Sequence, residues 1–390
     1  MNNLCADVGY LSINKFGEQL CGDHVEIVEQ SEDSLVMVLA DGLGSGVKAS
    51  ILSTLTAKII STMMANHMSI EDCVTTVAST LPVCEKRGIA YSTFTIIHVV
   101  DNKTAEVIQY DNPLMVFLHN GINCDYEKTN IIIGDKNIVK SKINLTPGDV
   151  LVAMSDGAVY AGVGKTLNFG WQRQNIIDYL EAVYENNLSA KIISTILLDQ
   201  CNRLYEGIPG DDTTISSIKI RKRQPMNLII GPPTDPNDVN KMMALFFAKE
   251  GKHIVCGGTT SNLAAQYLGK EIKAELDYVD PEIPPTSKIE GIDLVTEGVI
   301  TINRVLYYAQ NYLADNSCYA EWSIREDAAS SIARLLFEEA TDINFYVGKA
   351  INPAHQNPNL PISFNIKMRL IDELSNCLKM MGKRVNISYF

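Results

Sequence analysis

The chain has 390 residues, of which 46% are hydrophobic and 20% charged, and its formal net charge is −13. This length predicts about two domains, and the apolar content is too high for a disordered chain. The 46 acidic residues against 33 basic ones argue against general binding to nucleic acid, whose phosphates repel an acidic protein.

The nine cysteines and six histidines are scattered along the sequence. They form no CxxC or HExxH pattern, so neither a thiolate zinc site nor a disulfide framework is predicted. The first twenty residues lack the basic start and apolar stretch of a signal peptide. No apolar run approaches the roughly 18 to 20 residues that span a bilayer. We therefore expect a cytoplasmic protein without a membrane segment.

In the first half of the chain, the sequence predicts groups of consecutive strands and groups of consecutive helices, without strict alternation. A short apolar strand is predicted at residues 34–40, and Ser45 then begins a helix. In that helix Val47, Ile51, Leu55, Ile59 and Met63 recur every fourth residue, which predicts one buried face. Ser69 and Asp72 resemble the start of a second helix. Further strands are predicted at 91–100, 105–110, 115–119, 150–154 and 214–220, and further helices at 173–184 and 190–205.

Several consecutive strands with packed helices favour an α+β layered domain, predicted over residues 1–222. The clearest seam follows it, at residues 221–227 (RKRQPMN), where a basic run meets Pro225. Three basic charges at a seam are sometimes a nucleic-acid patch, but a solvated linker is the preferred interpretation.

The second half alternates regularly between strands and helices. Such alternation predicts an α/β, Rossmann-like domain over residues 226–390, with a mainly parallel sheet. Its role is interpreted as regulatory or ligand-binding. Strands are predicted at 227–230, 253–256, 274–279, 293–296, 344–347 and 384–389, and helices at 237–249, 260–268, 301–312, 325–338 and 367–381.

Four acidic positions share one local context in the first half. Asp23 follows Gly22, Asp41 and Asp156 each precede a glycine, and Asp211-Asp212 follows Gly210. Two of them directly follow apolar strands, LVMVLA and VLVAMS, which hold a carboxylate rigidly at a strand end. Glycine beside it lets a backbone carbonyl approach as well. Hard cations such as Mg²⁺ and Mn²⁺ prefer such oxygen ligands, although a single Asp-Gly pair more often marks a turn.

Taken in order, the segments LADGLGSGVKAS, LTPGDVLVAMSDGAV and GDDTTISSIKI resemble the metal-dependent protein phosphatases of the type 2C superfamily. They are most similar to the bacterial branch typified by the stage II sporulation protein E phosphatase domain. The segments GDH, YSTFTIIHV and AEVIQYDNPLMVFLHNG agree with this resemblance, which covers residues 9–220. It implies helices over a β-sandwich, and attack of a water activated by two Mn²⁺ or Mg²⁺ ions on phosphoserine or phosphothreonine of a protein.

Carried over to this sequence, the resemblance implies a set of metal-binding positions. Asp41 bridges both ions, the Gly42 carbonyl binds one of them, and Asp23 holds that ion directly or through water. Asp156 and Asp211 hold the other ion, so that Asp41, Asp156 and Asp211 are the implied catalytic residues. Asp212 is either a further metal position or a side chain that stabilises a turn, and Thr214 is the following hydroxyl position.

The sequence departs from the eukaryotic branch of the superfamily. Leu43 stands where that branch has a histidine, and Lys15 is the nearest basic residue before Asp23. The acid that protonates the leaving group is therefore unassigned, and His24 is one candidate. No room remains between residues 152 and 211 for the additional flap segment, and residues 161–170 with two helices are expected to cover the site.

The second half carries one candidate anion site, Gly257-Gly258-Thr259-Thr260, between a predicted strand and a helix. Backbone N–H groups at a helix start attract anions, although Thr260 or Ser261 as a plain helix cap is the preferred alternative. A small anionic effector is the ligand class that this segment suggests. Two other functions stay open for the whole chain: a catalytically silent scaffold with the phosphatase fold, and a small-molecule phosphatase.

Overall fold

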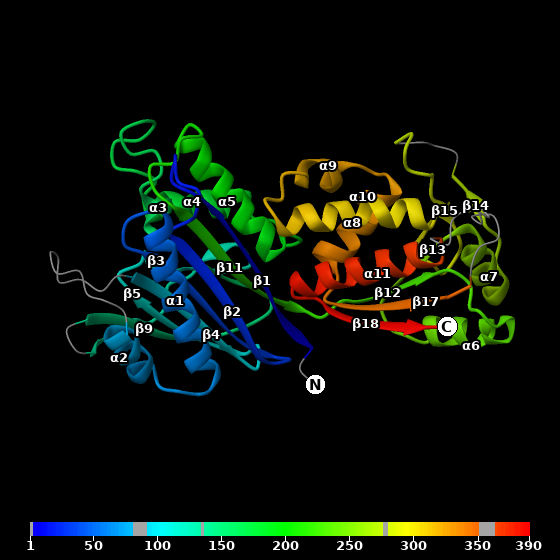
Figure 1. Ribbon diagram of the computed structural model, residues 1–390, viewed down its shortest axis with the longest axis horizontal. Coiled ribbons are helices and arrows are strands. Elements are labelled where there is room, and N and C mark those ends of the chain that lie inside the picture. The colour runs from blue at the N-terminus through cyan, green and yellow to red at the C-terminus, as the bar shows by residue number, and fades with distance from the viewer. Residues whose placement is uncertain (1–2, 81–91, 134–135, 276–279, 351–362) are drawn as a thin grey trace. The chain divides into compact units, whose positions relative to one another are not determined.

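The computed structural model describes residues 3–80, 92–133, 136–275, 280–350 and 363–390. The chain divides into two compact units, Met1–Lys222 and Arg223–Phe390 (Figure 1). Each unit has its own sheet system and its own buried core. No helix in the described part of the chain combines the length and apolar character that crossing a bilayer requires.

The first unit contains two antiparallel sheets. The larger has the order β2-β3-β4-β5-β9-β8 and the smaller the order β1-β11-β10-β6-β7. In the larger sheet the strands are β2 Asp23–Ser31, β3 Ser34–Gly42, β4 Ser92–Val100, β5 Thr104–Tyr110, β9 Lys136–Asn144 and β8 Thr129–Ile133. In the smaller sheet they are β1 Leu4–Ile13, β11 Thr213–Lys222, β10 Asp149–Met154, β6 Val116–His119 and β7 Ile122–Asn123.

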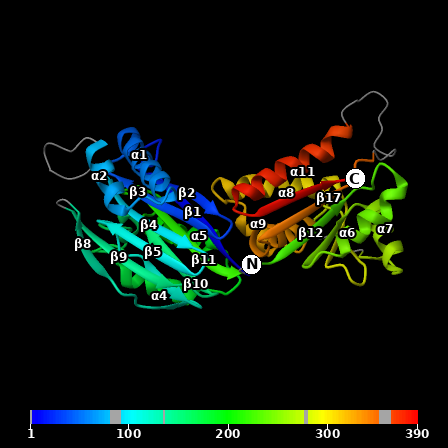
Figure 2. The same cartoon turned by 90° about the horizontal axis from the view of Figure 1, so that it is seen from below.

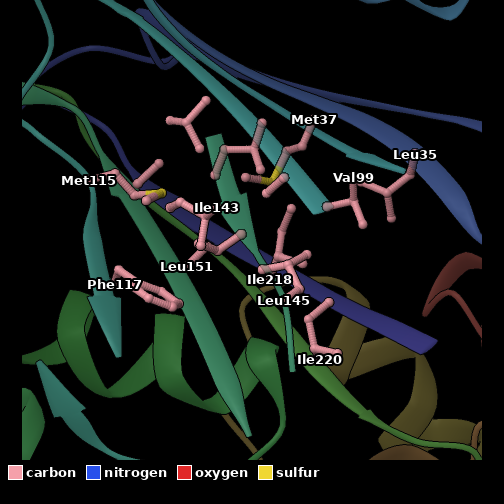
Figure 3. Packing of buried hydrophobic residues seen from close by; sticks show 14 of the residues in the cluster. Leu35, Met37, Val99, Met115, Phe117, Ile143, Leu145, Leu151, Ile218 and Ile220 are labelled. Carbon is pink, nitrogen blue, oxygen red and sulfur yellow. The ribbon is translucent and has the colours of Figure 1, made fainter. Parts of the chain in front are cut away.

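Alternation along the strands places the core between the two sheets. On β3, Leu35, Met37 and Leu39 belong to the cluster between the sheets, while Val36, Val38 and Ala40 belong to the cluster on the outer face. This follows from the two-residue period of a strand. Figure 3 shows the inner cluster, in which Leu151 and Ile218 of the smaller sheet contribute to the same core as Met37 and Val99 of the larger.

Helices cover both outer faces, as Figure 2 shows for α1 and α2 on one side of the strands and α4 on the other. The helices α1 Gly46–Ala65 and α2 Ile70–Thr80 cover the larger sheet, and α4 Arg173–Val183 and α5 Ala190–Leu204 cover the smaller. The short α3 Asp156–Val159 follows β10. This arrangement confirms the predicted α+β fold of helices over a β-sandwich.

The buried face of α1 differs from the prediction. Val47, Ile51 and Leu55 are exposed, Val47 by 62%. The buried face carries Leu52, Ile60 and Met64 together with small residues such as Ala49 and Ala57. Residues spaced by four advance about 400° around a helix, so such a row drifts by about 40° at each step. The row therefore winds out of one face, and small side chains let the helix backbone approach the sheet.

The helix predicted from Ser69 and Asp72 is confirmed. The Asp72 N–H donates to Ser69 Oγ over 3.1 Å, and Ser69 Oγ–H donates to Asp72 Oδ2 over 2.8 Å. This reciprocal pairing satisfies a free donor at the start of α2. The residue with which the strand predicted at 91–100 begins lies outside the described residues, and the strand itself is β4.

The second unit has a seven-stranded sheet of order β14-β15-β16-β13-β12-β17-β18. The five strands β16, β13, β12, β17 and β18 are parallel to one another. β14 and β15 form an antiparallel edge beside β16. This confirms the predicted α/β class. The strands are β12 Pro225–Ile230, β13 Lys252–Cys256, β14 Lys273–Ala274, β15 Ser287–Lys288, β16 Leu294–Thr296, β17 Asp342–Val347 and β18 Arg384–Tyr389.

The helices of the second unit pack on its sheet. Side chains of α6 and α7 form one core with β12, β13, β16 and β17. The 3₁₀ turn η1 precedes α6, and the π-helix η2 continues α10. The elements are η1 Pro236–Asp238, α6 Val239–Phe247, α7 Gly258–Leu268, α8 Val299–Leu313, α9 Tyr319–Ile324, α10 Ala328–Ala333, η2 Arg334–Glu339 and α11 Ser363–Met380.

One predicted helix of this unit was wrong in its bounds. The helix predicted at 325–338 begins only at Ala328, because Asp327 accepts the Ser330 N–H and caps it. Of the strand predicted at 274–279, Ala274 belongs to β14, and residues 276–279 lie outside the described ranges.

The seam between the units is less solvated than predicted. The Arg221 guanidinium lies 3.8 Å from Asp7, and the Arg223 guanidinium lies 3.5 Å from Asp342. Both arginine side chains are largely buried. Each therefore forms an ion pair within its own unit.

Candidate active site

Asp23 and Asp41 stand opposite each other on neighbouring antiparallel strands. They form one register pair of β2 and β3. Asp41 has the same parity as Met37 and Leu39, which point between the sheets. Because side chains alternate along a strand, both carboxylates point toward the space between the sheets, at the end of β3.

The other three aspartates come to this end from the smaller sheet. Asp156 begins α3 just after β10, and Asp211-Asp212 directly precedes β11. Two hydrogen bonds hold these chain segments together: the Ser155 N–H donates to Thr214 O over 3.0 Å, and the Thr214 N–H donates to Ser155 Oγ over 2.9 Å. The antiparallel pairing of β10 and β11 therefore sets Asp156 beside Asp211 and Asp212.

Two glycines make room for this arrangement. A Cβ on Gly42 would lie 2.2 Å from the Ala49 carbonyl oxygen, and a Cβ on Gly22 would lie 2.7 Å from Asp212 Oδ2. A side chain at position 42 would collide with the backbone of α1, and one at position 22 would displace the Asp212 carboxylate. The Gly42 N–H also donates to Gly22 O over 3.1 Å, so the backbones beside Asp23 and Asp41 are joined.

Burial among other carboxylates disfavours ionisation of the aspartates. Burial, followed by the charges of Asp23, Asp156 and Asp211, raises the pKa of Asp41 to about 9. Burial raises the pKa of Asp23 to about 7, partly offset by the nearby Ser155 and Thr214 hydroxyls. Burial likewise raises the pKa of Asp156 and of Asp211. Without a compensating positive charge, the centre therefore retains protons near neutral pH.

Three buried carboxylate oxygens have no hydrogen-bond partner among the described residues: both oxygens of Asp23, and Oδ2 of Asp212. The other oxygen of Asp212 accepts the Lys15 N–H over 3.0 Å. Buried unpaired oxygens are costly, and a cation would supply the missing partner. This observation fits the predicted metal chemistry.

The aspartates do not form a ready coordination shell. Across the described ranges, no group of three or more histidine, cysteine, aspartate or glutamate side chains is placed so that it could hold a metal ion. Asp41 nevertheless interacts electrostatically with Asp23, Asp156 and Asp211, since the charge of each raises its pKa. The ligand roles of the six predicted positions stay predictions.

Sequence reasoning missed Ser155, and it named Gly22 and Lys15 without their contacts to Asp212. Their signal was only adjacency: Ser155 precedes Asp156, and Gly22 precedes Asp23. Lys15 lies far from Asp212 in sequence but donates its backbone N–H to it. Burial raises the pKa of Asp211, and the positive charge of Lys15 offsets part of that rise. His24 forms a 3.0 Å hydrogen bond with Glu26.

In the second unit, Gly257 is the N-cap of α7, with a φ of 103°. The preferred alternative, a cap by Thr260 or Ser261, was wrong. Thr260 Oγ1 accepts the Gly231 N–H over 2.9 Å, and the Ser261 hydroxyl donates to Gly257 O over 2.9 Å. Gly258 and Thr259 lie in the first turn of α7, and the helix begins at the carboxyl end of β13, as a doubly wound ligand crevice requires.

Comparison with known proteins gives one family match. Residues 31–221 match the model of the family described as stage II sporulation protein E (SpoIIE). No curated protein matches the chain.

Several solved structures are similar to it. The PP2C phosphatase domain of SpoIIE from Bacillus subtilis, solved with a fragment of its regulatory domain, is 19% identical, with a TM-score of 0.49. That match covers 57% of this chain and 65% of the other. The RsbU and RsbW domains of a Mycobacterium tuberculosis protein are 16% identical, with a TM-score of 0.47, over 62% of this chain and 68% of theirs. The catalytic domain of the phosphatase PstP, solved with two manganese ions, is 13% identical, with a TM-score of 0.39, over 56% and 100%.

Proposed function

Residues 31–221 belong to the stage II sporulation protein E family of PP2C-type serine/threonine phosphatase domains, and from this premise we propose that the chain is a metal-dependent protein serine/threonine phosphatase. The observation that carries the proposal is the facing pair of Asp23 and Asp41. Asp23 is buried with both oxygens unpaired, and the pKa of each residue is raised. Protons or a cation can stabilise such a pair, and a cation takes the place of the protons when it binds.

The proposed roles of the residues follow from their positions. Asp41 pairs with Asp23 across β2 and β3, and the charges of Asp23, Asp156 and Asp211 all raise its pKa. It is thus suited to bridge two ions. Asp23 and the Gly42 carbonyl would hold one Mn²⁺ or Mg²⁺ ion, Asp156 and Asp211 the other, and Asp212 a further position. Two such ions lower the pKa of a bound water and offset charge on a phosphoryl group.

The chain's own residues prepare this centre. Gly22 leaves room for the Asp212 carboxylate, and Gly42 lets the backbone of α1 pack closely against the end of β3. The Lys15 N–H fixes one oxygen of Asp212 and leaves the other unpaired. The Ser155 and Thr214 hydroxyls favour the ionised form of Asp23, which is the form that binds a cation.

Two other functions remain to be separated by experiment. A catalytically silent scaffold would keep the fold but hydrolyse nothing, and the retention of every predicted aspartate favours an active enzyme. A small-molecule phosphatase would act on phosphomonoesters and ignore phosphorylated peptides.

We propose a regulatory role for residues 223–390, with a small anionic ligand bound at Gly257, Gly258, Thr259 and Thr260. The start of α7 offers backbone N–H groups, and the backbones of Gly257 and Gly298 approach each other, since a Cβ on Gly298 would lie 3.5 Å from Gly257 Cα. Calorimetric titration with inorganic phosphate tests this: binding should be lost in Gly258→Val. Binding heats that are the same in Gly258→Val and in the unaltered protein would exclude the proposed anion site.

The deciding experiment measures hydrolysis of p-nitrophenyl phosphate and of a phosphoserine peptide with Mn²⁺, with Mg²⁺ and with excess chelator. We expect both substrates to be hydrolysed with either metal and neither with chelator. No hydrolysis under any condition would support the silent scaffold. Hydrolysis of the small ester alone would support the small-molecule enzyme.

A further inference from the structure

Exposed apolar side chains gather on the segments that border the aspartates. Phe169 is 81% exposed and Phe16 is 67% exposed, although both are large aromatic residues. Single exposed apolar residues are ordinary, but a group of them marks an interaction surface. We define the apolar rim as Phe16, Leu20, Tyr160, Val163, Phe169 and Ile208, all of which are exposed.

Each part of the rim is adjacent in sequence to one of the aspartates. Leu20 lies three residues before Asp23, and Ile208 lies three residues before Asp211. On the remaining side, the Tyr160 N–H donates to Asp156 O over 3.0 Å. The rim residues therefore lie on the chain segments that carry Asp23, Asp156 and Asp211.

Hydrogen bonds join the rim segments to one another. The Phe16 N–H donates to Pro209 O over 2.9 Å, which connects the segment before β2 to the one before β11. Lys165 Nζ donates to Ile208 O over 2.8 Å and to Tyr205 O over 2.7 Å, which connects residues 160–170 to that same segment. The rim segments are thus joined into one structural unit.

The occupant of the rim must reach the aspartates and then leave. A permanently bound partner would block the centre, whereas a substrate occupies it transiently. An anionic membrane surface is disfavoured, because the chain carries a net charge of −13. A small phosphomonoester carries too few apolar groups to cover the six side chains of the rim.

Resting on the function proposed above, we propose that the rim binds apolar side chains that flank the phosphorylated residue, so that the substrate class is phosphoserine or phosphothreonine within apolar protein sequence. The exposed rings of Phe16 and Phe169 would be covered by the bound peptide. Burying such surface on binding is favourable in proportion to its area, and it distinguishes a protein substrate from a small ester.

The test uses the full chain and two phosphoserine peptides of equal length and charge, one with Leu, Val and Phe beside the phosphoserine and one with Ser, Thr and Gly. We expect the kcat/KM of the apolar peptide to be about tenfold higher, as partial burial of an aromatic ring predicts. In Phe16→Ser and in Phe169→Ser this ratio should fall toward one, chiefly through KM. The matched control is Ile132→Ser, which removes a side chain 79% exposed on β8 and should keep the ratio.

One contrary result is that the unaltered protein hydrolyses p-nitrophenyl phosphate and shows equal kcat/KM for the two peptides. That result would contradict the proposed role of the rim and leave the phosphatase proposal intact. Absence of all hydrolysis would overturn both. Light scattering of the same variants adds a second readout: if Phe169→Ser converts a dimer to a monomer, a second copy occupies the rim and the substrate proposal is wrong. A retained ratio in both rim variants would overturn it as well.

Discussion

Asp23 and Asp41 face each other directly across β2 and β3, where two like charges destabilise a strand pair. Both side chains point into the space between the two sheets. The pKa of Asp23 is raised to about 7 and that of Asp41 to about 9. The pair is therefore tolerated in the metal-free protein by holding protons. It can release them when a cation takes their place.

The stability of the metal-free protein should fall as pH rises. Between about pH 4 and pH 9 the folded protein binds more protons at these aspartates than the unfolded chain does, because their folded pKa values lie above the ordinary 3.8. Stability from this source is thus complete below about pH 4 and lost as the pH passes through the folded values. This loss of stability can be measured by thermal unfolding in chelator at pH 5, 7 and 9. We expect the Tm to fall by roughly several degrees over this range. Asp41→Asn should flatten the profile, and an unchanged slope in that variant would contradict the assignment.

Asp41→Ala should abolish metal-dependent hydrolysis, by at least about a hundredfold in kcat, since one side chain is proposed to serve both ions. The measurement is turnover of p-nitrophenyl phosphate with Mn²⁺. Asp125→Ala is the control, because that carboxylate is exposed and pairs with Lys128. Undiminished turnover in Asp41→Ala would exclude the bridging role.

Asp211→Asn and Asp156→Asn should each cost on the order of a hundredfold or more in kcat/KM, whereas Asp212→Asn should cost much less. Asparagine at 212 keeps an oxygen to accept the Lys15 N–H and a second polar atom beside the centre. The readout is kcat/KM across a range of Mn²⁺ concentrations. A larger loss in Asp212→Asn than in Asp211→Asn would reverse the proposed ranking of the two.

Gly42→Ala should destabilise the first unit by about 1 to 3 kcal/mol, as overpacking typically does. Its Cβ would lie 2.2 Å from the Ala49 carbonyl oxygen, a backbone atom of α1 that cannot move alone. Gly210→Ala is the control, since its nearest new contact is an ordinary 3.5 Å to the Tyr205 ring. Urea unfolding compares the two, and equal stability would mean that α1 shifts without cost.

A chain that ends at Lys222 should fold and retain metal-dependent hydrolysis. All the proposed metal positions precede β11, and the first compact unit ends where that strand ends, at Lys222. Circular dichroism and turnover of p-nitrophenyl phosphate check this. A folded, metal-binding fragment without activity would show that residues 223–390 take part in the chemistry.

The sequence allowed the fold class to be predicted because apolar runs and alternation mark the central strands. The strands β1 and β2 were missed, because their burial is partial and their alternation weak. The buried face of α1 was wrongly predicted because large apolar side chains lie on both sides of the helix: Ile51 is exposed, whereas Leu52 and Ile60 are buried. The contact of Lys15 with Asp212 joins residues 197 positions apart, and only the pairing of β1 with β11 brings them together.

That pairing also orders events during synthesis. β1 pairs along its whole length with β11, from Leu4 with Lys222 to Ile13 with Thr213. The first strand of this unit therefore pairs only after the last strand of the unit has been made, and such long-range pairing slows folding. Asp211 and Asp212 arrive with that last strand, so the acidic centre is completed only when the whole unit has been translated. A nascent chain stalled before residue 211 carries Asp23, Asp41 and Asp156 without the aspartates that complete the set.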